Sequence, residues 1–266
     1  MKKSFLLLAL CLYNLVLAIP LQDRKIDPTA LSELTSTLGI SPESDLIAET
    51  QARWLRKPGQ ERWEMEELSQ DQKNFVLLWS ESQGLFSEWK PLEKTYDKAL
   101  ILGASTSTMQ KRLGFLKQLW EEGVRFQEII WLTGDRPLDP RIEELTDRCT
   151  NESEAARIIW EETQLPLTMR NIPIFFVATP MKDGGKRPNT EDTLVTWLNT
   201  SPQPCKTLFI SNQPFCGYQF AIVKKSLPDS FLFDVVGPSS DPTGRPASAA
   251  IALDSIARWL YNIRGT

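Results

Sequence analysis

The sequence of 266 residues contains no histidine. This absence excludes the catalytic arrangements that use imidazole as a base, such as Ser-His-Asp triads and Cys-His dyads. It also excludes imidazole-rich zinc sites, and we expect no metal centre of that kind.

An excess of basic residues is also missing. The chain has 30 Lys and Arg against 34 Asp and Glu, a formal net charge of -4 and a pI near 5.2. Nucleic-acid binding needs a basic surface, so we expect no nucleic-acid partner. The remaining composition, 41% hydrophobic and 24% charged, is typical of one large globular domain or of a domain with an extension.

Cysteines are few and odd in number once the N-terminal one is set aside. Cys11 lies in the first apolar segment, which leaves Cys149, Cys205 and Cys216. An odd set implies at least one free thiol or an intermolecular bond. Cys205 and Cys216 are expected at opposite ends of one strand, too far apart to bridge at about 3.3 Å per residue.

The N-terminus has the pattern of a bacterial-type export signal. Lys2 and Lys3 precede a run of about 15 mainly apolar residues, with Val16 and Ala18 at the spacing of a cleavage site. The run is shorter than the roughly 20 residues of a spanning helix. Residues 1–18 are therefore predicted to be a signal peptide of a periplasmic or secreted protein, with membrane attachment only if the segment stays uncleaved.

Residues 19–95 predict a helical extension. Asp27-Pro28 and Gly39 have the spacing of a helix start and end, and residues 60–89 show a second helical pattern that Gly84 could interrupt. The segment holds four of the nine tryptophans, whereas disordered segments are poor in aromatic residues. We therefore expect it to pack on the main domain.

Residues 96–266 predict a Rossmann-like α/β domain. Five continuous apolar runs, typical of strands covered on both faces, alternate with helical patterns; they are residues 99–102, 129–132, 174–177, 208–210 and 231–236. Repeated strand-helix units favour right-handed crossovers. The expected fold is a three-layer, doubly wound, mostly parallel five-stranded sheet with a helical N-terminal extension.

A ligand site in such a fold lies beyond the carboxyl ends of the strands. The small and polar residues that follow the predicted strands are Gly103, Ser105, Thr106, Thr133, Gly134, Asp135, Ser211 and Asn212. The first strand is not followed by GxGxxG, the Gly184-Gly185-Lys186 run is not a P-loop, and GxSxG is absent. These residues therefore predict a polar ligand site without a nucleotide motif, and no cofactor can be assigned.

Three helix starts fall at the same edge, and each has two interpretations. The pattern of a helix cap occurs three times: at Asn151 with Glu154, in the run from Asn189 and Thr190 to Asp192, and at Ser211 or Asn212 before Pro214. Capped helix starts are also where anions bind. Arg112, one turn into its helix, can reach back toward the strand ends and meet a phosphate or carboxylate, or remain a surface residue.

A family resemblance rests on ordered motifs in residues 98–236. They are LGAS at 102–105, Arg112, WLTGD at 131–135, NESEAARIIWEE at 151–162, PNTEDT at 188–193 and LFISNQPFCGYQFA at 208–221. This series resembles the SanA/YdcF/ElyC family of envelope proteins. The resemblance implies pocket roles for Arg112, Glu154, Asn189, Thr190 and Glu191.

The chain also departs from that family. The family histidine falls on Phe215 or Cys216, and the family arginine falls on Tyr218 or Gln219. If these two residues carry catalysis or anion binding in the family, this protein has lost or rebuilt that function.

Three functions remain open at this point. The first is an exported SanA-like protein that binds a small polar or anionic ligand in cell-envelope maintenance. The second is a hydrolase or transferase on an envelope precursor, with Glu154 or Glu191 as general base. The third is a degenerate, non-catalytic interaction module. A hard cation held by Asp135, Glu152, Glu154 and Glu191 is a further, more speculative alternative.

Overall fold

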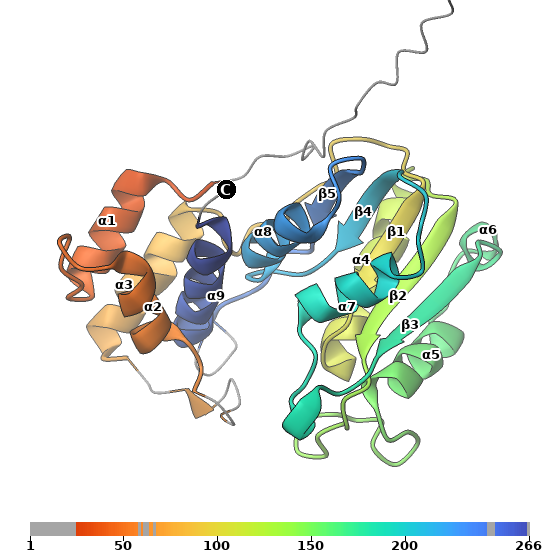
Figure 1. Ribbon diagram of the computed structural model, residues 1–266, viewed down its shortest axis with the longest axis horizontal. Helices are drawn as coiled ribbons and strands as arrows, with labels where there is room; N and C mark the ends of the chain where they lie inside the picture. Colours follow the sequence, from red (N-terminus) through yellow and green to blue (C-terminus); the bar gives the residue numbers. More distant parts are fainter. Residues whose placement is uncertain (1–24, 58–59, 61–63, 66–67, 244–247, 265–266) are drawn as a thin grey trace, which may run out of the picture.

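The computed structural model describes residues 25–57, 60, 64–65, 68–243 and 248–264. In this part of the chain a sheet covered by helices lies beside a group of four helices (Figure 1). The predicted signal segment, residues 1–18, lies outside the described residues. No described helix has both the length and the apolar character that a membrane span requires.

The predicted parallel sheet is confirmed, with all five strands at the expected places. They are β1 Lys98–Leu102, β2 Glu128–Gly134, β3 Ile174–Thr179, β4 Lys206–Ile210 and β5 Leu232–Val236. Every neighbouring pair is parallel, and the strand order is β3-β2-β1-β4-β5. The sheet is thus entirely parallel, where the sequence indicated a mostly parallel one.

Helices cover both faces of the sheet, as doubly wound topology requires. On one face α4 (Thr106–Glu121) and α5 (Glu152–Glu162) share a buried cluster with Ala99 and Ile101 of β1. On the other face α7 (Thr190–Leu198) and α8 (Cys216–Ser226) pack in a second cluster with Leu100 and Leu102. The alternation along β1 divides one continuous apolar run between two cores. A short helix, α6 (Leu167–Arg170), and a 3-10 turn, η2 (Asp183–Gly185), complete this part.

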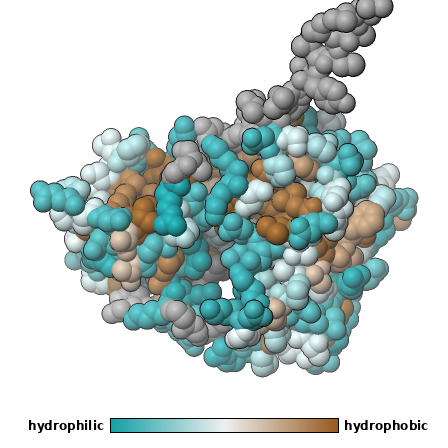
Figure 2. All heavy atoms as spheres, in the orientation of Figure 1, coloured by the Kyte–Doolittle hydropathy of each residue, from teal (hydrophilic) through white to brown (hydrophobic). Residues whose placement is uncertain are grey.

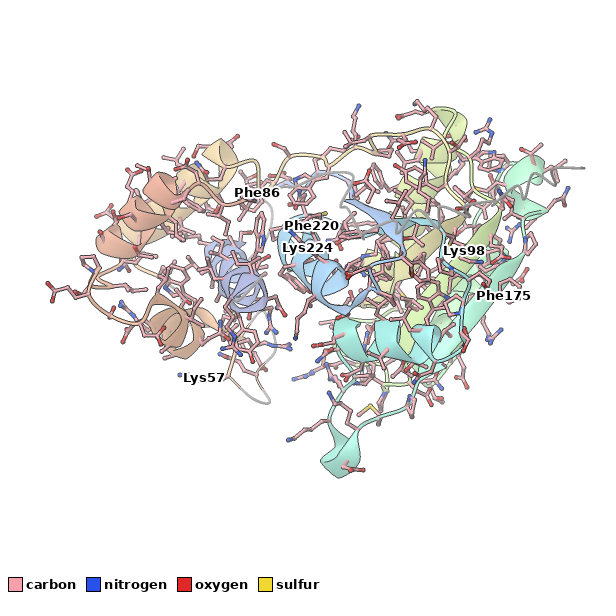
Figure 3. The ribbon with its side chains drawn as sticks, turned by 45° about the horizontal axis from the view of Figure 1, so that its top comes forward. Lys57, Phe86, Lys98, Phe175, Phe220 and Lys224 are labelled. Carbon is pink, nitrogen blue, oxygen red and sulfur yellow. The ribbon has the colours of Figure 1, made fainter. Side chains whose placement is uncertain are left out.

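Strand β3 departs from the expectation that each strand is covered on both faces. The side chain of Phe175 is 51% exposed and lies at the rim of the molecule (Figure 3). β3 is an edge strand with β2 as its single strand neighbour in the sheet. An apolar run therefore identified the strand but not its place at the edge.

The helical lobe combines the N-terminal extension with the last helix. It contains α1 (Pro28–Thr37), α2 (Leu46–Trp54), α3 (Gln70–Ser82) and α9 (Ser248–Ile263). α1 starts as predicted, because Asp27 accepts a hydrogen bond from the Ala30 amide at 2.7 Å and Pro28 occupies the first turn. α2 lies within the predicted helical extension, although no separate helix was specified there, and α3 occupies only part of the predicted region 60–89. Trp63 lies outside the described residues.

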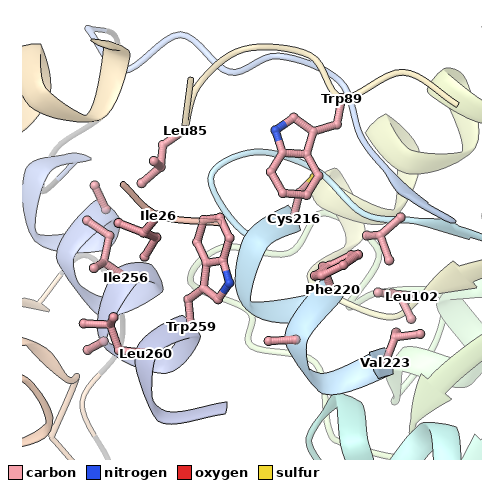
Figure 4. Packing of buried hydrophobic residues seen from close by; sticks show 14 of the residues in the cluster. Ile26, Leu85, Trp89, Leu102, Cys216, Phe220, Val223, Ile256, Trp259 and Leu260 are labelled. Carbon is pink, nitrogen blue, oxygen red and sulfur yellow. The ribbon is translucent and has the colours of Figure 1, made fainter. Parts of the chain in front are cut away.

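The lobe and the sheet share one hydrophobic cluster. Trp54, Trp79 and Trp89 are buried in it together with residues of α8 and of the sheet. α9 packs against α2, α3 and α8, and the rings of Trp89 and Trp259 meet edge to face with centroids 6.1 Å apart (Figure 4). α9 thus joins the helical lobe to the main sheet through α8.

Candidate functional site

The strand order places the topological switch point between β1 and β4. The chain leaves β1 toward α4 on one face and leaves β4 toward α8 on the other face. In doubly wound sheets this divergence opens the crevice in which ligands bind. Residues just after β1 and β4 therefore define the first place to look for a site.

Arg112 of α4 lies across this crevice. Its Nη1 atom donates hydrogen bonds to the carbonyl oxygens of Leu102 at 2.6 Å and Gly103 at 2.9 Å. Its Nε atom donates to Oδ1 of Asn212 at 3.0 Å, and the residue is 2% exposed. Arg112 reaches the strand ends, where the sequence placed it, and its guanidinium there contacts oxygens of the protein itself.

A second buried ionic cluster lies at the ends of β1 and β2. The guanidinium of Arg136 contacts both oxygens of Glu143, at 2.8 and 2.9 Å, and Oε2 of Glu152 at 2.6 Å. Glu143 also accepts from the amide of Thr106 at 3.1 Å, and Glu152 accepts from the amide of Gly134 at 3.1 Å. Both glutamates are buried, so this cluster fixes the loop that follows β2 onto the first turn of α4.

The pKa values of the two glutamates are shifted in opposite directions. Burial alone would raise the pKa of Glu143, but hydrogen bonds from Arg136 and from two backbone amides hold it below its ordinary value. For Glu152 burial dominates and raises the pKa, with Arg136 opposing the shift. Burial disfavours the charged form of Arg136, yet its hydrogen bonds with Glu143 and the charge of Glu152 keep its pKa above the ordinary value.

Gly103 is required by this cluster. A Cβ atom at Gly103 would overlap with Oε1 of Glu152 and would lie 2.7 Å from the carbonyl oxygen of Leu132. The sequence predicted Gly103 as part of a polar ligand site. The group that approaches it in the structure is the chain's own carboxylate.

Two of the predicted helix caps are present. Asn151 caps α5 by accepting from the Glu154 amide at 2.9 Å, and Asn189 forms a complete capping box with Asp192 at the start of α7. The box at Asn151 is incomplete, because the Glu154 carboxylate accepts from Thr150 instead, at 2.8 and 3.0 Å. These hydrogen bonds from Thr150 lower the pKa of Glu154.

The cap predicted at Ser211 or Asn212 is wrong. α8 begins at Cys216 after Phe215, and no side chain of the described residues caps it. The Asn212 carbonyl accepts from the Phe215 amide at 2.9 Å, so a turn separates Ser211 and Asn212 from the helix. The two side chains contact Gln219 and Arg112 instead.

The remaining predicted residues are dispersed along the edge. Thr133 donates from Oγ1 to the Val177 carbonyl at 3.3 Å, and Ser105 donates to Thr108 at 3.0 Å. The Thr190 carbonyl accepts from Thr193 at 3.0 Å, and Asp135 is exposed. The proposed general bases lie on different helices: Glu154 is exposed on α5, and Glu191 on α7 pairs with Lys225 at 3.1 Å. The structure does not bring these two glutamates together.

The carboxylates considered for a cation are also separate. Glu152 faces Arg136, whereas Glu154 faces Thr150 and Glu191 faces Lys225. Across the described ranges, no group of three or more His, Cys, Asp or Glu side chains has the arrangement of a metal site. Cys149, Cys205 and Cys216 take part in no disulfide among the described residues, and burial raises the pKa of Cys205 to about 11.

A pocket of about 460 Å³ lies beside the Arg112 crevice. Three segments line it: Lys111, Phe115 and Gln118 of α4, Asn212 and Gln213 after β4, and residues 238–241 after β5. Of the predicted site residues, Asn212 belongs to this described lining. Sequence reasoning missed Lys111 and Gln118 in the wall formed by α4. For the wall formed by the segment after β5, the small and polar residues Ser239 and Ser240 beside Pro238 were a usable signal.

The pocket walls are held by backbone and amide hydrogen bonds. Gln213, 1% exposed, donates from Nε2 to the Ser87 carbonyl at 2.7 Å, and the Ser240 amide donates to the Phe86 carbonyl at 3.0 Å. Trp89 and Gly237 exchange two backbone hydrogen bonds. The segment that leads from α3 to β1 therefore supports two of the three walls.

Comparisons with protein-family models, with curated proteins and with solved structures find no match to this chain. The fold and the pocket geometry therefore carry the functional argument, and the resemblance to the SanA/YdcF/ElyC family stays a prediction.

Proposed function

We propose that this protein is an exported, SanA-like envelope protein that binds a small polar or anionic ligand at the carboxyl edge of its sheet. The pocket between α4 and the loops after β4 and β5 is the proposed site. The observation that carries this proposal is the position of a pocket of about 460 Å³ next to the switch point, with Lys111 in its wall. Pockets of roughly 300–1,000 Å³ at switch points are typical ligand sites.

A non-catalytic role receives specific support from α8. The family histidine falls on Phe215 or Cys216 and the family arginine on Tyr218 or Gln219; Phe215, Cys216 and Gln219 are buried and Tyr218 is half-buried. Cys216 and the neighbouring Gly217 pack close to Gly237 and Trp259. These positions serve packing in this chain, which favours a binding protein or interaction module over a hydrolase or transferase.

The binding proposal is tested by thermal unfolding with a panel of probes. The panel contains inorganic phosphate, glutamate, uridine diphosphate, glucose 6-phosphate and N-acetylglucosamine, because a ligand that binds only the folded state raises Tm. We expect saturable stabilisation by at least one probe and its loss in Lys111→Met. Lys186→Met, an exposed lysine in a turn away from the pocket, is the matched control and is expected to respond like the wild type.

The same experiment can reject the site. If no probe raises Tm, or if Lys111→Met, Gln118→Ala and Lys186→Met all respond equally to every probe, the pocket is not a ligand site, and the interaction-module alternative is favoured. Export is tested separately by mass spectrometry of protein recovered outside the cytoplasm. Cleavage after Ala18 is expected, and an intact residue 1–18 segment would contradict a cleaved signal.

A further inference from the structure

We infer that the ligand of this pocket is an unphosphorylated carbohydrate. The inference rests on the proposed function and narrows its ligand class. Two observations lead to it: the chain's own carboxylates occupy the positions at this edge where a phosphate would bind, and the pocket lining combines amides and hydroxyls with no excess of positive charge.

Helix starts at the carboxyl edge are where α/β proteins hold phosphates. At α4 the first amide, that of Thr106, already donates to the buried carboxylate of Glu143 at 3.1 Å. At α7 the Asp192 carboxylate accepts from the amide of Asn189 at 2.8 Å. A phosphate at either position would displace or face a fixed negative charge.

The starts of α5 and α8 are no better suited to binding a phosphate. The first turn of α5 carries Glu152 and Glu154, and α8 begins with the buried residues Cys216 and Gly217. Gly217 lies so close to Trp259 of α9 that a Cβ atom there would overlap with the ring. The starts of α4, α5, α7 and α8 thus disfavour a phosphorylated or nucleotide ligand.

The pocket itself is balanced in formal charge. Among its described lining residues Lys111 is the cation and Asp241 is the anion. Single charges of opposite sign do not compensate the cost of removing a doubly charged phosphate from water. A neutral ligand, or one with a single weak charge, is therefore the better electrostatic match.

The uncharged lining matches sugar hydroxyl groups. Ser239 and Ser240 bring hydroxyl groups, which both donate and accept hydrogen bonds as a sugar hydroxyl does. Nε2 of Gln118 donates to Glu122 at 2.8 Å and Nε2 of Gln213 donates to the Ser87 carbonyl at 2.7 Å, so these two residues offer a ligand their amide oxygens as acceptors. Phe115 and Pro238 add apolar surface, against which the C–H face of a pyranose can pack. The combination favours a carbohydrate over an apolar ligand or a phosphate ester.

The inference is tested by titration calorimetry and saturation-transfer NMR on the purified protein. The sugar probes are N-acetylglucosamine, its β-1,4-linked disaccharide and cellobiose; the phosphate probes are inorganic phosphate, glucose 6-phosphate and uridine diphosphate. We expect a sugar probe to bind, and Gln118→Ala to weaken that binding about fivefold, the loss of one hydrogen bond. Gln110→Ala, exposed on the same helix outside the lining, is the control and is expected to leave the affinity unchanged.

Each other outcome has a defined meaning. Binding of a phosphate probe that Lys111→Met abolishes, without sugar binding, would overturn the carbohydrate inference and leave the proposed pocket in place. Sugar binding that Gln118→Ala and Lys111→Met both leave unchanged would move the site elsewhere and overturn the inference and the proposed pocket. Absence of binding by all six probes would reject the inference and count against a ligand-binding function.

Discussion

The Nε atom of Arg112 donates a hydrogen bond to Oδ1 of Asn212, 3.0 Å away, although the two residues are 100 positions apart in the sequence. The same guanidinium binds two carbonyl oxygens at the end of β1. Arg112 therefore joins α4, β1 and the loop after β4 at the point where the two halves of the sheet diverge. The crevice expected to receive a ligand contains a side chain that stabilises the fold.

Replacing Arg112 with methionine is expected to lower the free energy of unfolding by about 3 kcal/mol. The change removes these donors from the oxygens of Leu102 and Asn212, which are buried residues, and of Gly103, which is half-buried. Each unsatisfied buried polar group costs about 1–3 kcal/mol. Urea denaturation followed by circular dichroism measures the change. The control is Lys111→Met, where the wild-type lysine is exposed, and it is expected to stay within about 0.5 kcal/mol of wild type. An Arg112→Met protein as stable as this control would show that the hydrogen bonds of Arg112 contribute nothing to the free energy of unfolding.

Glu143→Gln is expected to destabilise the protein by about 3 kcal/mol at pH 7. The substitution removes the buried negative charge that pairs with the half-buried Arg136, and breaking a largely buried ion pair from one side is costly. Glu144→Gln is the matched control, because Glu144 is the exposed neighbour. Equal urea midpoints for the two variants at pH 7 would contradict a stabilising role for the cluster.

The difference between wild type and Glu143→Gln is also expected to depend on pH. Because folding lowers the pKa of Glu143 from its ordinary 4.5, its contribution is fully present above about pH 4.5 and is lost as pH falls through the folded value. The stability gap should therefore narrow between pH 5 and pH 3. A gap that stays constant over this range in urea titrations would show that Glu143 ionises in the folded protein as it does in the unfolded chain.

Much of the fold could be predicted from local patterns, because each strand and most helices are specified by neighbouring residues. The apolar runs at 99–102 and 208–210 identify β1 and β4, and Asp27-Pro28 identifies the start of α1. The exposure of β3 could not be predicted, since it depends on which strand lies at the sheet edge. The bounds of α2 within the predicted helical extension could not be specified, because its buried residues, Thr50 and Trp54, form too weak an apolar pattern.

The site was less predictable, because its contacts join residues that are far apart in the sequence. Patterns located the strand ends, and they placed Arg112 near those ends, but they could not show which groups meet there. Glu143 lies in a loop without periodicity, yet its carboxylate reaches the first amide of α4, 37 positions away. The pocket is lined by three segments far apart in sequence, so Lys111 and Gln118 become lining residues only when the β4 and β5 loops are placed beside α4.

The Cys205 thiol is expected to react slowly with alkylating reagents. Burial raises its pKa from 9.0 to about 11, with Lys98 opposing the shift, so at pH 9 it holds roughly fifty-fold less thiolate than an ordinary cysteine. Iodoacetamide labelling of Cys205 between pH 8 and pH 11, followed by peptide mass spectrometry, measures this. Labelling in urea is the reference. A folded-state rate equal to the unfolded-state rate at pH 9 would contradict the raised pKa.

The contact between α8 and α9 is tested by Gly217→Ala. Gly217 is buried, and a methyl group there would overlap with the Trp259 ring, with Cδ2 only 2.7 Å away. Overpacking of this kind costs about 1–3 kcal/mol, which outweighs the gain in helix propensity of about 1 kcal/mol for replacing glycine with alanine.

Gly114→Ala, on α4, is expected to change the free energy of unfolding in the opposite direction. A Cβ atom at Gly114 meets no described atom within 4 Å, so only the propensity gain remains, and this variant is expected to gain about 0.5–1 kcal/mol. Urea denaturation of both variants should therefore move the midpoints in opposite directions. Because Trp259 also contacts Trp89, Gly217→Ala is further expected to shift the tryptophan fluorescence of the folded state. Stabilisation by both substitutions would mean that α8 and α9 are not in close contact at this position, and that the helical lobe is joined to the sheet less tightly than the packing of Trp259 requires.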